Sequence, residues 1–247
     1  MSGSHNKPID VPQGPFDVAG LTAEEIQARV LHRDGLMLVI DKPAGLPVHR
    51  GPKGGANLEA SFDSLRYGLP RPPVLAHRLD KDTSGCLVLG RHRKATASLG
   101  LLFKHGKIGK TYWAVVEGGP AEDEGTIDMP LGRLNAERGW WQKPDPEGQT
   151  AVTNWKVCGR SDGLCWLALE PVTGRTHQLR VHTSATGWPI VGDNIYGNGP
   201  RFGAPVLHLH SREIVVPISK NKEPVRVVAP APEHMRERLR ACGWNGE

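Results

Sequence analysis

The chain has 247 residues, of which 38% are hydrophobic and 23% charged, as in a globular protein with a sizeable buried core. Its 30 glycines and 21 prolines are scattered singly, an excess that indicates many turns and excludes a long helical bundle, a coiled coil or a collagen-like protein. Lysine and arginine (31) outnumber aspartate and glutamate (26), and this net charge of +5 weakly favours a polyanionic partner.

The cysteines and the apolar segments indicate a reducing compartment and no membrane anchor. None of the four cysteines lies in a C-x-x-C pair, so neither a zinc ribbon nor a dithiol redox site is predicted, and their low density speaks against a disulfide scaffold. The longest apolar runs are far shorter than the about 18 residues of a membrane span. Residues 1–14 lack the apolar core of a secretory signal. We therefore expect a cytoplasmic protein in which residues 1–20 form a flexible arm.

The first half of the chain after this arm is predicted to mix short strands and helices. Thr22 and Glu25 have the spacing of a capping box, which predicts a helix to about residue 31. Residues 41–49 carry two prolines and a glycine and are predicted to be irregular. Strands are predicted at residues 36–40, 74–78, 86–89 and 110–117, and helices at residues 58–69 and 95–104.

The second half is predicted to begin with a turn-rich stretch, residues 118–149, that contains short strands. Strands follow at residues 152–158, 164–169, 206–210, 213–216 and 225–228, and helices at residues 176–185 and 233–241. Because most strands are joined by hairpins, we expect an α+β fold with a mixed, mainly antiparallel sheet and flanking helices and loops. No repeat or linker is visible, so residues 21–247 are predicted to form a single domain.

Residues 77–85, with the sequence HRLDKDTSG, are the most informative segment for function. They place a polar loop that carries carboxylates between two apolar strands, and such loops on a rigid scaffold are where catalytic groups usually lie. Asp80 and Asp82 are therefore candidate catalytic residues. The alternative is that either aspartate caps a turn through its own backbone.

A second cluster is found at residues 174–182, with the sequence GRTHQLRVH. On a helix, His177 and Arg180 are three residues apart and share a face, so Arg180 could meet a carboxylate from elsewhere in the chain. The alternative is a half-buried helix whose basic residues face solvent.

Other chemistry is less well supported by the residues. Histidines could bind a metal, and the candidate ligands are His77, His177, His182, His208 and His210. Because the sequence has no H-E-x-x-H motif, we expect no metal site. Residues 51–55 lack the ending of a phosphate-binding loop, and no G-x-S-x-G is present. Basic runs at 91–94 and 104–110 could follow a phosphate backbone, and Trp140, Trp141 and Tyr112 could stack on bases, although each alone equally suits a solvated face or a core.

Taken together, these motifs resemble the RluA family of RNA pseudouridine synthases over about residues 36–228. The family's signature is matched by residues 77–85, and its other motifs follow in order at residues 41–49, 110–118, 174–182, 189–197 and 207–210. The chain departs from the family in two places. Only about 35 residues precede the first core strand, where many relatives carry a small RNA-binding domain, and residues 215–217 keep only the proline of the C-terminal motif.

The resemblance implies the pseudouridine synthase catalytic fold, without a separate N-terminal RNA-binding domain, and isomerisation of specific uridines in structured RNA without metal or organic cofactor. Asp80 would be the essential carboxylate, Arg180 its partner and Tyr112 the residue that stacks on the uracil. Arg78 would fill the place of the flipped base. Further contacts to the RNA or to the base are expected from His77, Arg175, His177 and Gln178.

Several alternatives stay open on the sequence. The RNA could be ribosomal large-subunit RNA, tRNA or both, and Asp80 could attack the ribose or assist cleavage in another way. A ribosome-assembly factor that binds RNA and whose isomerase activity is secondary or lost would not need Asp80, Tyr112 and Arg180 together. A metal-dependent nucleic-acid hydrolase that uses the histidines would be inhibited by EDTA. A monomer is the default expectation.

Overall fold

The computed structural model describes residues 20–51, 54–135, 140–219 and 221–246. The predicted arm, residues 1–20, therefore lies outside the described residues except for Gly20. The strands are β1 (Val30–Arg33), β2 (Met37–Lys42), β3 (Val74–Leu75), β4 (Ser84–Gly90), β5 (Gly109–Glu117), β6 (Glu124–Asp128), β7 (Leu131–Arg133), β8 (Gln142–Pro144), β9 (Val152–Ser161), β10 (Leu164–Pro171), β11 (Leu209–Val216) and β12 (Val225–Val228). The helices are α1 (Ala23–Ala28), the 3-10 helix η1 (Leu58–Leu65), α2 (Arg93–Lys104), α3 (Gln178–Ala185) and α4 (Glu233–Ala241).

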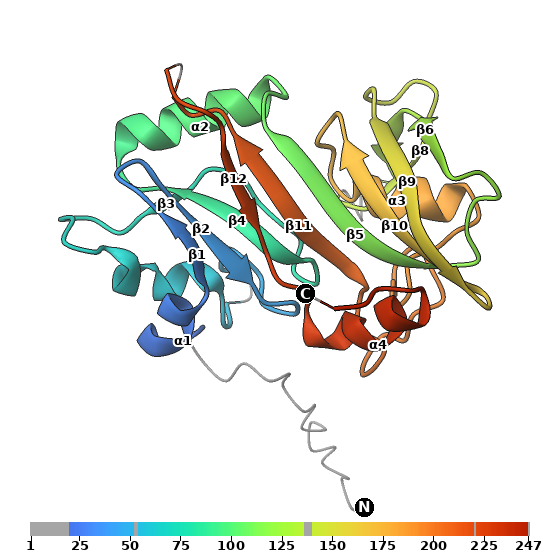
Figure 1. Cartoon of the computed structure of the whole chain (residues 1–247). Helices are drawn as coiled ribbons and strands as arrows, with labels where there is room; N and C mark the ends of the chain where they lie inside the picture. The colour runs from blue at the N-terminus through green and yellow to red at the C-terminus, as the bar shows by residue number, and fades with distance from the viewer. Residues whose placement is uncertain (1–19, 52–53, 136–139, 220, 247) are drawn as a thin grey trace, which may run out of the picture.

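Ten of the strands form one sheet in the order β1-β2-β4-β11-β5-β10-β9-β6, with β12 paired to β11 and β3 to β4. Figure 1 shows β11 and β5 in the middle, the N-terminal strands on one side and β10, β9 and β6 on the other. The pairing of β4 with β11 is parallel, whereas the neighbouring pairings are antiparallel. The expected α+β fold with a mixed, mainly antiparallel sheet is confirmed.

The middle of the sheet is covered on both faces. Because successive side chains of a strand point to opposite faces, one strand contributes to the apolar clusters on both sides. On β4, Leu87 and Leu89 pack into one apolar cluster while Cys86 and Val88 pack into another. Helix α2 contacts β4, α3 contacts β8 and β10, and α4 contacts β5. No described helix combines the length and the apolar character that crossing a membrane requires.

Some predicted boundaries are wrong. The first helix stops at Ala28, because the next residues pair with β2 instead of continuing the helix. The predicted helix at 58–69 is a 3-10 helix that ends at Leu65, and the predicted strand at 74–78 has only two residues. The two strands predicted at 206–210 and 213–216 are one strand, β11, whose register against β5 shifts between Ser211 and Glu213.

Candidate active site

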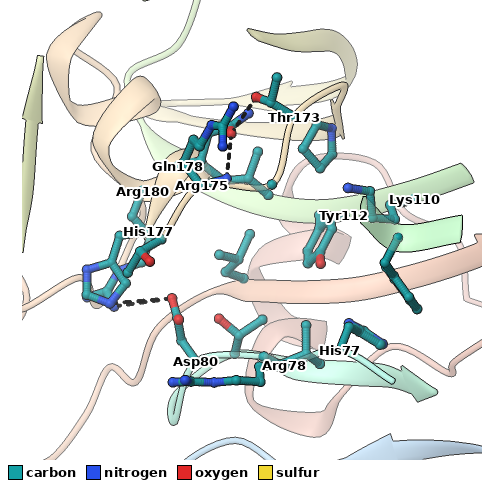
Figure 2. Close-up of a pocket in the computed structure, with 18 residues that line it drawn as sticks. His77, Arg78, Asp80, Lys110, Tyr112, Thr173, Arg175, His177, Gln178 and Arg180 are labelled. Carbon is teal, nitrogen blue, oxygen red and sulfur yellow. Dashed lines mark hydrogen bonds and ion pairs between the residues drawn. The ribbon is translucent and has the colours of Figure 1, made fainter. Parts of the chain in front are cut away.

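A cleft of about 480 Å³ opens where three segments distant in the sequence meet. They are the loop from β3 to β4, which carries residues 77–83, the strand β5, and the loop from β10 into α3. Figure 2 shows Asp80, His177 and Arg180 at one end of the cleft and Tyr112 and Lys110 at the other. The residues 77–85 and 174–182, singled out from the sequence, thus line one cleft.

Asp80 faces two nitrogen-bearing groups from the start of α3. Its Oδ2 lies 3.6 Å from Nε2 of His177 and 3.9 Å from Nη1 of Arg180, and its side chain stays 32% exposed. His177 adopts a left-handed conformation (φ 54°) as the residue before α3, which is why the helix begins at Gln178 and not at residue 176 as predicted. The carboxylate is therefore held between basic groups and remains open to the cleft.

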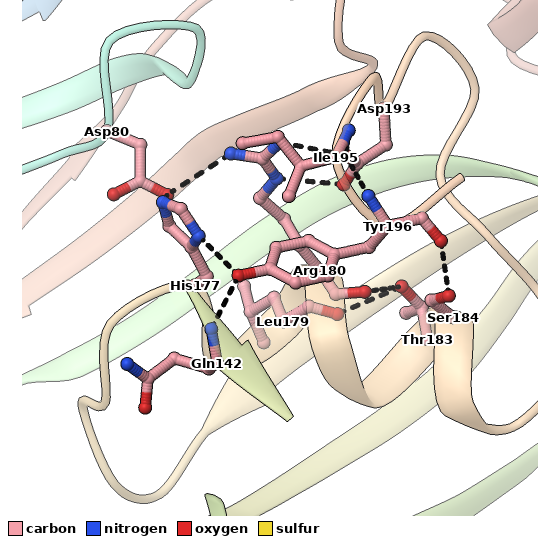
Figure 3. Close-up of polar contacts among 10 residues, drawn as sticks. All are labelled: Asp80, Gln142, His177, Leu179, Arg180, Thr183, Ser184, Asp193, Ile195 and Tyr196. Atoms are coloured by element: carbon pink, nitrogen blue, oxygen red, sulfur yellow. Dashed lines mark hydrogen bonds and ion pairs between the residues drawn. The ribbon is translucent and has the colours of Figure 1, made fainter. Parts of the chain in front are cut away.

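Arg180 is fixed by a second carboxylate, Asp193. Their side chains form two hydrogen bonds, Nε to Oδ2 and Nη2 to Oδ1, both of 2.8 Å, and both side chains are buried. Oδ1 of Asp193 also accepts the backbone N–H groups of Ile195 and Tyr196. Burial alone would raise the pKa of Asp193, but the hydrogen bonds and charge of Arg180 hold it below its ordinary value. The remaining nitrogen, Nη1, is left facing Asp80 (Figure 3).

His177 is oriented by Tyr196. The Tyr196 hydroxyl lies 2.7 Å from Nδ1 of His177 and accepts the backbone N–H of Gln142 at 2.9 Å (Figure 3). With the hydroxyl proton donated to Nδ1, the ring carries its own proton on Nε2, the nitrogen that faces Asp80. Burial lowers the pKa of His177, aided by the Arg180 charge and opposed by Asp80. The imidazole is thus a neutral donor at neutral pH.

The turn that presents Asp80 is held by Lys42, at the end of β2. Its side chain is fully buried, and Nζ donates hydrogen bonds to the carbonyl oxygens of Pro43 (2.8 Å), Lys81 (2.8 Å) and Thr83 (2.9 Å). Burial lowers the pKa of Lys42 to about 7, although nearby aspartates oppose the shift. Beyond the turn, a Cβ on Gly85 would lie 2.2 Å from the Ser211 carbonyl oxygen, so only glycine allows β4 to approach β11 there.

Tyr112, on β5, lines the cleft wall (Figure 2). Burial raises its pKa to about 12, and the nearby Asp80 adds to the shift, while a hydrogen bond with Ser211 opposes it. The phenol therefore keeps its proton at neutral pH. It offers a neutral aromatic ring close to the Asp80 carboxylate.

The other predicted contact residues differ in how they are placed. Arg78 and Arg175 are exposed at the cleft, and Nε of Arg175 donates to the Thr150 carbonyl. Gln178 is buried and uses its side chain inside the protein, accepting from Thr173 and from the Arg175 N–H. For Gln178, as for the arginines, contact with RNA stays a prediction.

His77 also lines the cleft but is tied to the protein. Its ring stacks on Phe103 with centroids 4.2 Å apart, and Nε2 accepts the Val88 N–H. Burial, together with the charge of Lys110, lowers its pKa to about 3. Its predicted RNA contact likewise remains untested.

The other three candidate metal ligands are each hydrogen-bonded within the protein. His182 binds Thr153 and the Met129 carbonyl, His210 binds Ser84, and His208 binds the Val206 carbonyl. Across the described parts of the chain, no three or more His, Cys, Asp or Glu residues are grouped so as to hold a metal ion.

Three residues that position the cleft side chains were missed by the sequence analysis, namely Lys42, Asp193 and Tyr196. All three lie within segments that it had singled out, residues 41–49 and 189–197. The chain order of those motifs was the available signal, but it gave no indication of which side chains would contact the Asp80 loop or α3.

Comparisons with known proteins agree with this geometry. The family model for RNA pseudouridylate synthase matches residues 36–185. An RNA pseudouridine synthase of Zymomonas mobilis is 43% identical over 209 residues, which cover 83% of this chain and 94% of that protein. The ribosomal large subunit pseudouridine synthase C of Vibrio parahaemolyticus is 31% identical over 236 residues, which cover 90% of this chain and 73% of that protein.

A solved structure shares the fold. The human RNA pseudouridylate synthase domain containing 4 superposes with a TM-score of 0.73 at 29% identity, over 88% of this chain and 95% of that chain. The residues that the family model matches, 36–185, include the three segments that build the cleft. The chain therefore belongs to the RluA-type family of RNA pseudouridine synthases, isomerases that act on uridine in RNA.

Proposed function

We propose that this chain isomerises specific uridines of a structured RNA as a cytoplasmic monomer, and that Asp80 is its essential carboxylate. The observation that carries the proposal is the position of Asp80, open to the cleft between the Arg180 guanidinium and the Tyr112 ring. The cleft offers a carboxylate oxygen for the ribose and an aromatic face for the uracil, held at fixed positions on one wall and the other.

The reaction breaks the bond from C1′ of the ribose to N1 of uracil and forms a bond from C1′ to C5. The proton on C5 is lost, and N1 ends with a proton. Asp80 acts either by attacking C1′ or by assisting departure of the base. Tyr112, with its phenol neutral, stacks on the uracil near the C5 proton. Arg180 and His177 keep Asp80 oriented.

The target base is proposed to leave its stack, because Asp80 lies in a cleft and a base inside a duplex is not accessible to such a group. Arg78 is exposed beside Asp80 and is proposed to fill the space that the base leaves. Arg175, His177 and Gln178 form the opposite wall and are proposed to contact the flipped nucleotide or the adjoining RNA. No cofactor is part of the proposed reaction.

Ribosomal large-subunit RNA and tRNA are the two candidate substrates. The relative named ribosomal large subunit pseudouridine synthase C supports the first. The rival function is a ribosome-assembly factor that binds RNA and whose isomerase activity is secondary or lost. It is less well supported, because Asp80, Tyr112 and Arg180 converge on one cleft.

Tritium release tests the proposal. Transcripts of ribosomal and transfer RNA labelled with tritium at C5 of uracil are incubated with the protein, with and without EDTA. Release from one transcript is expected, and it identifies the RNA at the same time. Binding without release from any transcript would instead support the assembly factor. Release that EDTA abolishes would contradict a metal-free reaction.

A further inference from the structure

Lys110 differs from every other buried or half-buried lysine or arginine among the residues that the structure describes. The others have hydrogen-bond or ion-pair partners within the protein, as Lys42 has three carbonyls and Arg180 has Asp193. Lys110 is half-buried and makes neither a hydrogen bond nor an ion pair with a described residue. Its ammonium group is therefore left without a counter-charge.

The position of Lys110 directs this charge into the cleft. Lys110 lies on β5 two residues before Tyr112, so both side chains project from the same face of the strand. Among the described residues, no neighbouring carboxylate acts on its charge. A Cβ placed on Gly174 would lie 3.9 Å from Nζ, and Phe103 and His77 line the same part of the cleft. In Figure 2, Lys110 lies beyond Tyr112 as seen from Asp80.

A half-buried ammonium group without a partner destabilises the free protein, because it has lost part of its hydration. Burial accordingly lowers the pKa of Lys110, and no anion offsets the shift. A half-buried, unpaired ammonium group inside a cleft is expected where a bound ligand supplies the anion.

We propose that Lys110 binds a backbone phosphate of the RNA, next to the uridine whose base stacks on Tyr112. The inference rests on the proposed function, since it assumes that RNA enters this cleft. Phosphate is the anion that RNA carries at every nucleotide, and the compact lysine ammonium is well suited to it. Residues two apart on a strand are about 7 Å apart, so a single nucleotide with its adjoining phosphates can reach both side chains.

The salt dependence of RNA binding tests this contact. Affinity for in vitro transcripts of ribosomal and transfer RNA is measured at several salt concentrations for the wild type and for Lys110→Met, which keeps the length of the side chain and removes its charge. We expect the slope of log affinity against log salt to become shallower by about 0.7 to 0.9, the contribution of one phosphate contact. Lys110→Arg should keep the wild-type slope.

The matched control is Lys156→Met, which removes the same charge from an exposed position on β9, away from the cleft. Its slope should equal that of the wild type. An unchanged slope in Lys110→Met, or an equal change in Lys156→Met, would overturn the inference.

Thermal unfolding without RNA separates binding from a structural role. If the charge of Lys110 is paired only when RNA is bound, Lys110→Met unfolds at the wild-type temperature or above, because an unpaired charge has been removed. A lower midpoint would assign Lys110 to the fold instead.

Tritium release by the wild type is measured on the same transcripts. A changed slope without tritium release would support the phosphate contact and overturn the isomerase function. Release with an unchanged slope would support the isomerase function and overturn the phosphate contact.

Discussion

Among single residues, Asp80 and its surroundings carry the proposed chemistry, and its charge can be removed with little change of shape. In Asp80→Asn we expect turnover to fall below detection while RNA affinity stays within about tenfold of wild type, because the cleft keeps its walls and its basic groups. Tritium release and a binding assay measure the two quantities separately. Asp162→Asn is the matched control, since it removes the same charge from an exposed turn between β9 and β10 that does not line the cleft. Turnover retained in Asp80→Asn would contradict the assignment.

Variants of the Arg180 and Asp193 pair should affect the stability of the fold and the turnover of the enzyme differently. Arg180→Met leaves the buried Asp193 carboxylate without its cation, and we expect a loss of about 3–5 kcal/mol in unfolding free energy. Adding Asp193→Asn removes the unpaired charge and keeps an oxygen for the backbone N–H groups, so much of this loss should be recovered.

Turnover should not return in the double variant, because Asp80 still lacks the Arg180 nitrogen that faces it. Urea unfolding and tritium release on the same preparations measure both quantities. A double variant with full activity would show that Arg180 serves the fold alone.

At the scale of elements, the turn that carries Asp80 depends on the end of β2. Lys42→Met removes one ammonium group from three buried carbonyl oxygens, and we expect unfolding free energy to fall by about 3 kcal/mol. Turnover should fall as well, because Asp80 precedes two of those carbonyls in the same turn. Lys81→Met, at an exposed position of that turn, is the control and should leave stability unchanged. A Lys42→Met variant as stable as wild type would contradict this role.

The elements that could be predicted are those whose pattern is local. The strand at 110–117 and the helix at 95–104 correspond to β5 and α2, because alternation and helical spacing are read within one segment. The strand β11 was split in two because a register shift between Ser211 and Glu213 interrupts its pattern. The start of α3 was misplaced because helical spacing continues through His177, whose left-handed backbone conformation only the tertiary structure reveals.

The same distinction applies to the candidate site. Asp80, Tyr112 and Arg180 could be named because each lies in a motif that resembles a known family. Asp193 could not be given its role, because its partnership with Arg180 spans 13 residues of chain and depends on the loop after α3 folding back. In the sequence Lys110 is only one residue of a basic run, since the lack of a partner in the folded protein has no signature in sequence.

At the scale of the whole molecule, the sheet brings the site together. The parallel pairing of β4 with β11 places the Asp80 loop beside the strand that also pairs with β5 (Figure 1). Buried histidines lie at this junction. His210 is fully buried with Nδ1 2.8 Å from the Ser84 hydroxyl, and His208 is buried just before β11. Stability of this junction should therefore depend on the protonation of the two rings.

Burial lowers the pKa of His208 to about 4 and that of His210 to about 3. Both rings are neutral in the folded protein and take up protons near pH 6.5 once it unfolds. The folded state is therefore fully favoured above that pH and loses stability as the pH falls toward the folded values, by about 1.4 kcal/mol per pH unit for each histidine. Asp41 opposes this trend, because burial raises its pKa to about 6.

A single substitution isolates the histidine contribution from that of Asp41. Urea unfolding of wild type and of His210→Asn is compared at pH 7.5, 6.5, 5.5 and 4.5, since asparagine keeps a polar atom near Ser84 but does not titrate. The stability of the wild type should fall more steeply below pH 6.5 than that of the variant, by about 1.4 kcal/mol per pH unit. His105→Asn, at an exposed position after α2, should leave the wild-type slope unchanged. Equal slopes for wild type and His210→Asn would mean that His210 is not held neutral by burial.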